Sequence, residues 1–483
     1  MKVLMFGWEF PPHISGGLGT ASYGITRGMS KIEDVELIFV VPKLYGDEDS
    51  GVAKLVGAEN IKMSFENEEL KQFYKQQSIS SISEKIKDEE VYSVDEFMKK
   101  ITKIEINSFL TPYLSPDNFE AYLKNIGIED LSRVRVTKDG KIVYYENGEY
   151  REIILDRFEK STLTDEGYFQ FSGKYGANLI EEVRNYGKVA AKIAMQYDFD
   201  IIHAHDWLTY LAGIEAKRIS GKPLVIHVHA TEYDRSGENV NPVVFSIEKA
   251  GMVNADRIVT VSNLTKNIVT EKYKIDEKKI TTVYNAVEPV ASQRSHYRKT
   301  VDEKIVTFLG RVTYQKGPEY FVEAAKLVLD RTPNVRFVMA GSGDLLRRMI
   351  LRAAQLQINH KFHFTDFLKG DDVDRMFSIS DVYVMPSVSE PFGISPLEAM
   401  RSNVPVIISK QSGVAEILKY AIKVDFWDTQ AIANAIYGLV SYDGLSEFFA
   451  KYGKTEVDSL KWENAAQNLK AVYDTVYPVY QTL

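Results

Sequence analysis

The sequence predicts an α/β protein built from two doubly wound domains. Short apolar runs, such as Lys2–Gly7 and Val35–Val41, alternate along the chain with stretches that favour helices. This alternation begins a second time at Lys304–Arg311, after a polar linker around residues 288–302. Buried strands that alternate with helices are typical of parallel sheets covered on both faces. Two such series joined by a linker therefore predict two domains of this class.

Domain boundaries are expected where the alternation stops. We expect a first domain over residues 1–290, a second over 300–462 and a last helix over 463–483. A charged segment at about 45–175 interrupts the first domain and predicts an inserted α+β subdomain. Within it, Glu66–Lys103 favours a helix. Residues 133–155 carry Asp-Gly and Asn-Gly turns between alternating runs, which predict a three-stranded antiparallel meander.

Composition excludes several classes of protein. The 483 residues carry a net charge of -8, which argues against a protein that wraps duplex nucleic acid or coats an anionic membrane. There is no cysteine, so disulfides and thiolate metal sites are excluded. No run approaches the roughly 20 apolar residues of a membrane helix, and the first strand is too short for a signal peptide. We therefore expect a cytoplasmic location, and the sequence specifies no oligomeric state.

Polar residues directly after the predicted strands indicate one shared site. In doubly wound domains, ligands bind at the carboxyl ends of the strands, and here in the cleft between two such domains. The segments in these positions are Gly16-Gly17-Leu18-Gly19, His205-Asp206-Trp207, His229, Asn285, Arg311 and Glu390. The glycines lead into a helix expected from about Ala21 to Lys31, an arrangement in which backbone amides approach an anion closely.

The stretch Ser387–Met400 has the pattern of a phosphate-binding turn. Ser395 fits a helix N-cap and Pro396 the first helical position, so the amides of residues 393–395 would point out of a helix N-terminus. Two carboxylates, Glu390 and Glu398, flank this turn. An alternative is purely structural, because Ser395 and Glu398 also have the spacing of a capping box.

Two cations lie on the loop that follows the first strand of the second domain. Arg311 and Lys316 are suited to a diphosphate, because arginine can bind two oxygens at once while lysine acts as a point charge. The alternative is a solvated basic turn. Together with the turn after Ser387, we interpret them as a phosphate site.

Two histidine pairs, His203/His205 and His227/His229, have i,i+2 spacing on predicted strands. Each pair therefore shares one face of the sheet. A zinc site is one alternative, since imidazole is a common ligand. We favour a core position for the inner histidines and an active-site position for His229, which precedes a polar loop at Ala230–Gly237.

Taken together, these motifs resemble the retaining GT-B glycosyltransferases, most closely the glycogen and starch synthase group. The resemblance rests on the glycine turn at Gly16, on His205-Asp206-Trp207, on Arg311 with Lys316 and on the Glu390/Glu398 spacing. Three positions depart from the glycogen synthase pattern: Ser15, Phe392 and Glu398. The Glu390/Glu398 spacing is more typical of the broader sucrose-synthase-like group, and Ser15 leaves the choice between ADP-glucose and UDP-glucose open.

The resemblance implies two Rossmann-like domains that face each other across a cleft, with the last helix crossing back to the first domain. It also implies a role for each matching residue. The donor-binding positions are Gly16 and Gly17 at the distal phosphate, Asn285 and the Phe392-Gly393-Ile394 amides at the sugar, and Glu398 at the ribose. The catalytic positions are His229, Arg311, Lys316 and Glu390. Asp206 and Trp207 would line the acceptor side.

The implied reaction is transfer of glucose, with retention, from UDP-glucose or ADP-glucose onto an α-1,4-glucan. No cofactor or metal is expected. Alternatives are a retaining transferase with a small-sugar acceptor, as in sucrose or trehalose synthesis, and a non-catalytic nucleotide-sugar-binding protein. A glycosidase that uses Glu390 and Glu398 as acid and nucleophile would leave the two cations and the amide turn unexplained.

Overall fold

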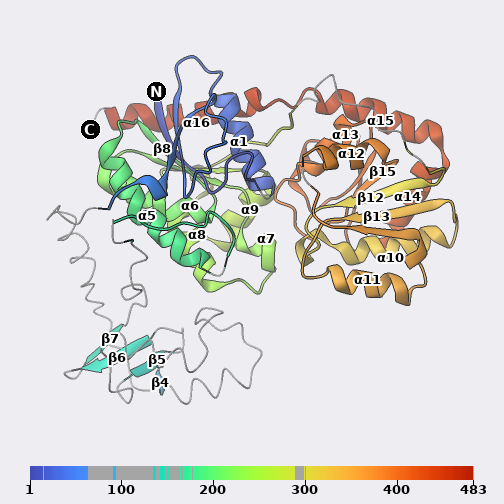
Figure 1. The fold of residues 1–483 in the computed structure, drawn as a ribbon, viewed down its shortest axis with the longest axis horizontal. Helices are drawn as coiled ribbons and strands as arrows, with labels where there is room; N and C mark the ends of the chain where they lie inside the picture. Colours follow the sequence, from blue (N-terminus) through green and yellow to red (C-terminus); the bar gives the residue numbers. More distant parts are fainter. Residues whose placement is uncertain are drawn as a thin grey trace. The chain divides into compact units, whose positions relative to one another are not determined.

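A computed structural model describes residues 1–14, 16–63, 91–93, 134–137, 142–146, 149–152, 164, 167–176, 178–288, 299, 301–368 and 370–481. The chain divides into two compact units (Figure 1). The larger unit comprises residues 1–58, 172–240 and 244–483, and the smaller one residues 59–171 and 241–243. Within the described residues, no helix combines the length and low polarity that a membrane crossing needs.

The first domain contains a seven-stranded sheet in the order β11-β10-β9-β8-β1-β2-β3, in which every pairing is parallel. Its strands are β1 (Lys2–Phe6), β2 (Glu36–Val41), β3 (Lys54–Gly57), β8 (Ile201–His205), β9 (Leu224–Val228), β10 (Arg257–Thr260) and β11 (Ile280–Thr282). The helices are α1 (Gly17–Met29), α5 (Leu179–Gln196), α6 (Trp207–Ser220), α7 (Glu232–Ser236), α8 (Pro242–Asn254) and α9 (Asn263–Lys272). The central strands are buried almost throughout, as expected for a sheet covered on both faces.

The second domain contains a six-stranded parallel sheet in the order β14-β13-β12-β15-β16-β17. Its strands are β12 (Lys304–Leu309), β13 (Val335–Ala340), β14 (Phe362–Thr365), β15 (Val382–Met385), β16 (Val406–Ser409) and β17 (Ile422–Val424). Its helices are α10 (Pro318–Leu329), α11 (Leu346–Gln355), α12 (Asp371–Ile379), α13 (Ser395–Arg401), α14 (Thr429–Ser441) and α15 (Asp443–Val457). The predicted class, two doubly wound parallel α/β domains, is confirmed.

Short 3₁₀ turns connect several of these elements. They are η1 (Ala58–Asn60), η5 (Glu277–Lys279), η6 (Tyr314–Lys316), η7 (Asn359–Lys361) and η8 (Gly413–Glu416).

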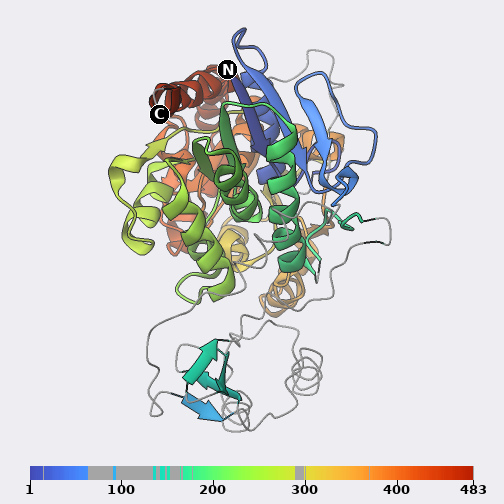
Figure 2. The same ribbon diagram turned by 90° about the vertical axis from the view of Figure 1, so that its left-hand side faces the viewer.

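The last helix, α16 (Trp462–Gln481), packs on the first domain beside α1 (Figures 1 and 2). Trp462, Leu469 and Tyr473 join the core formed by Val3, Phe39 and their neighbours. The close approach depends on glycine, because a Cβ on Gly24 of α1 would lie 2.2 Å from the Trp462 indole.

Both sheets have a topological switch point. This is a pair of neighbouring strands from which the chain connections lead to opposite sides of the sheet. It lies between β1 and β8 in the first sheet and between β12 and β15 in the second. Ligands of open α/β sheets bind at such points. The glycine turn follows β1, His205 ends β8, Arg311 follows β12 and Glu390 follows β15, so these predicted site residues lie at the switch points.

The smaller unit contains an antiparallel sheet in the order β4-β5-β6-β7 (Figure 1). Its strands are β4 (Val91–Ser93), β5 (Val134–Thr137), β6 (Ile142–Glu146) and β7 (Glu149–Glu152). The predicted three-stranded meander is therefore confirmed as β5, β6 and β7. The helical expectation for Glu66–Lys103 is wrong at residues 91–93, which pair with β5, and its remainder lies outside the described residues.

Candidate active site

The end of β15 carries a carboxylate that is paired with a lysine of the neighbouring loop. Lys316 forms an ion pair with Glu390, which is 7% exposed. The Ser387 hydroxyl donates a second hydrogen bond to Glu390 Oε2, at 3.2 Å. Strands β12 and β15 are neighbours, and this adjacency brings together two residues that are 74 positions apart in the sequence.

The turn between Glu390 and α13 carries backbone amides for which the described residues offer no acceptor. Gly393 is buried and has a φ of 101°, a conformation that glycine adopts readily. Among the described residues, the amides of Gly393 and Ile394 donate to no other group. Gly393 is buried and Ile394 half-buried, and amides shielded from water normally have partners, so these two are available to an incoming oxygen atom. The adjacent Phe392 is buried, 3% exposed.

The start of α13 differs from the expectation by one residue. Ser395 is the first helical residue and Ile394 the N-cap, and no side chain caps the helix. The Ser395 hydroxyl instead bonds the hydroxyl of Tyr383 at 2.8 Å, because β15 lies directly beneath the turn. The capping-box alternative is therefore wrong. Glu398 lies in the first turn of α13 and is half-buried.

Arg311 is exposed at the end of β12, and its guanidinium donates to Gln315 Oε1 at 3.0 Å. Gln315 is 4% exposed, and its backbone carbonyl accepts the amide of Val388 at 2.9 Å. This link ties the loop that carries both cations to the segment that carries Glu390. Gln315 has no feature in the sequence that would have singled it out.

The glycine turn of the first domain is open to solvent. Gly16 and Gly17 are exposed, and a Cβ on either would meet no atom of the described residues within 4 Å. Gly17 is the first residue of α1, so the helix begins four residues earlier than expected. The thirteen-residue helix places its N-terminal amides at this turn, where an anion is stabilised.

Asp206 is strained and almost fully buried. Its φ is 62°, unusual for a residue other than glycine, and it is 4% exposed. Its carboxylate accepts hydrogen bonds from the Arg235 guanidinium at 3.0 Å and from the amide of Ala230 at 3.4 Å. Burial raises the pKa of Asp206, and the Arg235 charge opposes that shift. The neighbouring Trp207 is the first residue of α6 and is 7% exposed.

The segment with Arg235 corrects another expectation. Residues 230–237 were predicted as a polar loop, but Glu232–Ser236 form α7, with a capping box between Thr231 and Asp234. The Thr-x-x-Asp spacing was the signal in the sequence that could have identified this helix. Arg235 also pairs with Glu232 and Glu248, so one guanidinium holds three carboxylates.

His229 is the outermost of four stacked imidazoles, which we call the histidine column: His203, His205, His227 and His229. His205 Nδ1 and His229 Nε2 share a hydrogen bond of 3.0 Å. At the other end, His203 Nδ1 bonds the hydroxyl of Tyr473 from α16. Burial lowers the pKa of all four rings, that of His229 to about 3, so the column is uncharged at neutral pH.

The histidine column is a poor metal site. Nitrogen atoms of His203, His205 and His227 lie within 4.8 Å of one another. Their rings stack at interplanar angles of 11–25°. A nitrogen lone pair lies in the plane of its ring, so nearly parallel, displaced rings do not aim at one ion. The zinc alternative is not supported by this geometry, and the expectation that no metal takes part stays a prediction.

Asn285 follows β11 and is 8% exposed. It belongs to the same edge of the first sheet as His229, because β9, β10 and β11 are consecutive neighbours. Its role at the donor sugar stays a prediction.

The edges of the two domains touch through hydrogen bonds within the larger unit. The Ser389 hydroxyl donates to Asp234 Oδ1 at 2.6 Å. The Glu416 carboxylate accepts the first amides of α9, from Asn263 at 2.9 Å and Leu264 at 2.7 Å. Sequence reasoning missed these residues, because their partners lie more than 150 positions away.

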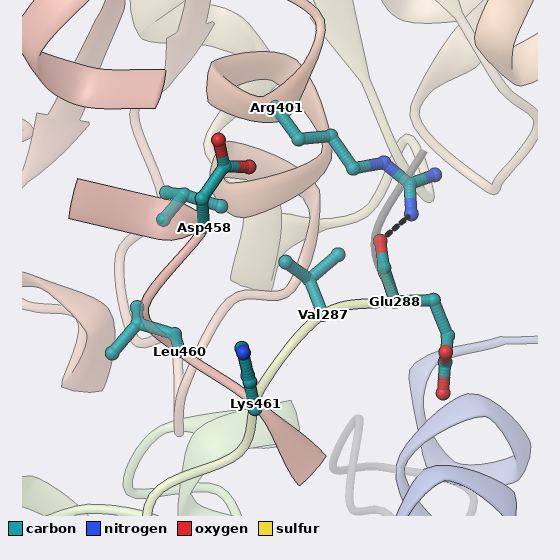
Figure 3. Close-up of a pocket in the computed structure, with 7 residues that line it drawn as sticks. Val287, Glu288, Arg401, Asp458, Leu460 and Lys461 are labelled. Atoms are coloured by element: carbon teal, nitrogen blue, oxygen red, sulfur yellow. Dashed lines mark hydrogen bonds between the residues drawn. The ribbon is translucent and has the colours of Figure 1, made fainter. Parts of the chain in front are cut away.

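A small pocket lies where the chain passes between the domains (Figure 3). Its lining residues are Val287, Glu288, Arg401, Val457, Asp458, Leu460 and Lys461. Arg401 points toward Glu288 and donates to its carbonyl oxygen at 2.7 Å. None of the predicted site residues lines this pocket, so it is separate from the switch-point site.

The fold and the two switch-point edges define a protein of the GT-B type, with two Rossmann-like domains. A family model described as glycosyl transferases group 1 matches residues 290–456, and one described as glycosyltransferase family 4 matches residues 174–290. An uncharacterised glycosyltransferase of Methanocaldococcus jannaschii is 32% identical over 294 residues, which cover 57% of this chain and 75% of that protein. The chain therefore belongs to the glycosyltransferases.

Other relatives share the fold at lower identity. A D-inositol 3-phosphate glycosyltransferase of Salinispora arenicola is 26% identical, over 58% of this chain and 70% of that protein. Sucrose-phosphate synthase of Thermosynechococcus elongatus superposes with a TM-score of 0.62 at 16% identity and covers 99% of both chains. HepE of Anabaena, solved with UDP-glucose, has a TM-score of 0.51 at 17% identity, over 59% of this chain and 82% of that one.

Proposed function

We propose that this glycosyltransferase moves glucose, with retention of configuration, from UDP-glucose or ADP-glucose to an α-1,4-glucan. The observation that carries the donor part of the proposal is the set of groups around Gly393. The exposed Arg311 and the Lys316–Glu390 pair lie on segments that are hydrogen-bonded to each other at the switch point of the second sheet, and the turn after Glu390 carries two amides that have no acceptor among the described residues.

These groups suit the chemistry of a departing diphosphate. In a retaining transfer without an enzyme nucleophile, the sugar becomes oxocarbenium-like while negative charge grows on the leaving oxygen. Preorganised donors that face this charge stabilise the transition state. Arg311 and Lys316 supply positive charge, and the amides of Gly393 and Ile394 supply donors that need no reorientation.

The first domain supplies the other side of the donor site in this proposal. The amides at Gly16 and Gly17 would bind the distal phosphate, since both residues are exposed within the described part of the chain. His229 would approach the sugar as a neutral ring, because its pKa is far below neutral pH. Asn285 would contact the sugar, Glu398 the ribose, and Asp206 and Trp207 the acceptor side.

A small acceptor is the second candidate, and the names of some relatives support it. Their names include transferases to D-inositol 3-phosphate and to 2-deoxystreptamine, and a sucrose-phosphate synthase shares the fold. The glucan rests on the motif resemblance alone. The two candidates use the same donor site and differ in the acceptor.

A donor and acceptor panel tests the proposal. The protein is incubated with UDP-glucose or ADP-glucose and, in separate reactions, with glycogen, maltooligosaccharides, glucose, fructose 6-phosphate or inositol phosphate, and released nucleoside diphosphate is measured. We expect release that depends on a glucan, with an α-linked product by NMR. Release only with a small acceptor would select the second candidate, and a β-linked product would exclude retention.

Binding measurements separate an enzyme from a sugar-nucleotide sensor. Titration calorimetry with UDP and ADP reports donor binding without turnover. Tight binding with no release in any reaction would leave the non-catalytic alternative. Arg311→Ala should weaken binding at least tenfold, because a charged hydrogen bond contributes about 1.5–3 kcal/mol. Arg331→Ala, an exposed arginine of the same domain, is the matched control.

A further inference from the structure

The turn after His229 is held by two buried carboxylates. Asp206 accepts the amide of Ala230 at 3.4 Å, and Asp234 Oδ2 accepts the amide and the hydroxyl of Thr231, both at 2.7 Å. Asp206 and Asp234 are 4% and 1% exposed. Bonds to a backbone amide fix the path of the chain, so these carboxylates determine where His229 lies.

The second oxygen of Asp234 reaches the other domain. Oδ1 accepts the Ser389 hydroxyl at 2.6 Å, and among the described residues this is its only donor. Ser389 directly precedes Glu390, the partner of Lys316. One hydrogen bond therefore connects the turn that carries His229 to the segment that carries Glu390.

We propose that Ser389 and Asp234 are positioning residues that fix His229 of the first domain against the Lys316–Glu390 pair of the second. The kinetic part of this inference rests on the proposed function. Neither residue touches the reacting atoms: each acts through its neighbour in the chain, Glu390 in one case and the Thr231 turn in the other.

The chemistry of the contact supports a specific role. A hydroxyl donor on an ionised carboxylate makes a short, strong bond, and 2.6 Å lies within the range of such bonds. A buried carboxylate oxygen that loses its hydrogen-bond donor raises the free energy of the folded protein. Other contacts also join the domains: the Glu416 bonds to α9, a 3.4 Å bond from the Thr265 hydroxyl to the Pro391 carbonyl, and an apolar cluster that Val261 shares with Phe392. Of these described contacts, the bond from Ser389 to Asp234 is the one that involves the turn after His229.

Kinetics give the first test, with three variants. Ser389→Ala removes the hydroxyl, and Ser389→Thr keeps it. Ser378→Ala removes the hydroxyl of an exposed residue of α12, which bonds within that helix. We expect Ser389→Ala to lower kcat about tenfold or more with little change in KM for the donor, because small displacements of catalytic groups have effects of this size. Ser389→Thr should recover most of kcat, and Ser378→Ala should equal the parent protein.

Distances between spin labels give a test that does not depend on activity. The chain has no cysteine, so Val253→Cys in the first domain and Leu351→Cys in the second accept labels specifically. Both positions are exposed, 56% and 54%. With and without UDP or ADP, we expect one narrow distance distribution in the labelled parent and in its Ser378→Ala form. Ser389→Ala should broaden the distribution.

Two results would overturn the inference: an unchanged distance distribution in Ser389→Ala, or an unchanged kcat where the parent is active. If the parent shows no transfer with any donor and acceptor, the proposed function fails. The distance measurement then still decides whether Ser389 and Asp234 hold the two domains in register.

Discussion

The polar groups at the two switch-point edges differ in burial and in charge. At the edge of the first sheet, four imidazoles are buried and uncharged, and Asp206 is neutralised by Arg235. At the edge of the second sheet, Arg311 is exposed and two amides have no acceptor in the described part of the chain. We infer a division of work that rests on the proposed function. The second edge would supply charge and donors for the diphosphate, with the Gly16 turn of the first edge at the distal phosphate, and the histidine column would supply a fixed surface for the uncharged sugar.

The largest effect is expected when a cation is removed from the edge of the second sheet. Lys316→Ala should lower turnover about 10²–10³-fold, because it removes one preorganised cation from the leaving group. Released nucleoside diphosphate is the measure, and circular dichroism should show that the fold is kept. Lys326→Ala, on the outer surface of α10, is the matched control. Turnover near that of the parent would remove Lys316 from the mechanism.

The second prediction concerns the histidine column and the stability of the protein at acidic pH. Unfolded histidines take up protons as the pH falls below about 6.5, but the folded column does not, since burial lowers its pKa values. The free energy of unfolding should therefore decrease as pH falls from 6.5 toward 5, by up to about 1.4 kcal/mol per pH unit for each histidine.

A variant sharpens this prediction. His227→Leu removes a ring in which neither nitrogen has a partner in the described structure. Urea unfolding at pH 7.5, 6 and 5 gives the free energy of unfolding as a function of pH. In this variant its slope should correspond to about one proton fewer taken up on unfolding. Exposed His360, changed to Gln, should leave the slope as it is. Equal slopes in all three proteins would mean that the column takes up protons while folded.

The smallest effect is expected when the hydrogen bond at the inner end of the histidine column is removed. Tyr473→Phe removes the hydroxyl that bonds His203 and should lower the free energy of unfolding by about 1 kcal/mol. Donor affinity should be unchanged, because Tyr473 is fully buried on α16. Tyr477→Phe on the same helix loses a hydroxyl without a hydrogen bond among the described residues. A loss of activity in Tyr473→Phe at full stability would contradict the division of work between the edges.

The same contrast explains what the sequence could predict. Alternating apolar runs predict both sheets, because local periodicity reports burial on two faces. At the second edge, Arg311 and Lys316 lie within one loop, so their spacing was visible. At the first edge, Asp206 meets Arg235 from 29 positions away, on a helix that was predicted as a loop. Ser389 and Asp234 are 155 positions apart. Only the packed fold shows such pairs.

The glycines of α1 have a consequence for biosynthesis. Gly24 leaves room for the Trp462 ring, so the core that begins at β1 is completed by residues 462–476. On the ribosome, β1 and α1 are made long before residues 462–476, so their hydrophobic surface is not fully covered until those residues have emerged. Until then they present that surface to chaperones, and truncation before residue 462 should yield a product that aggregates.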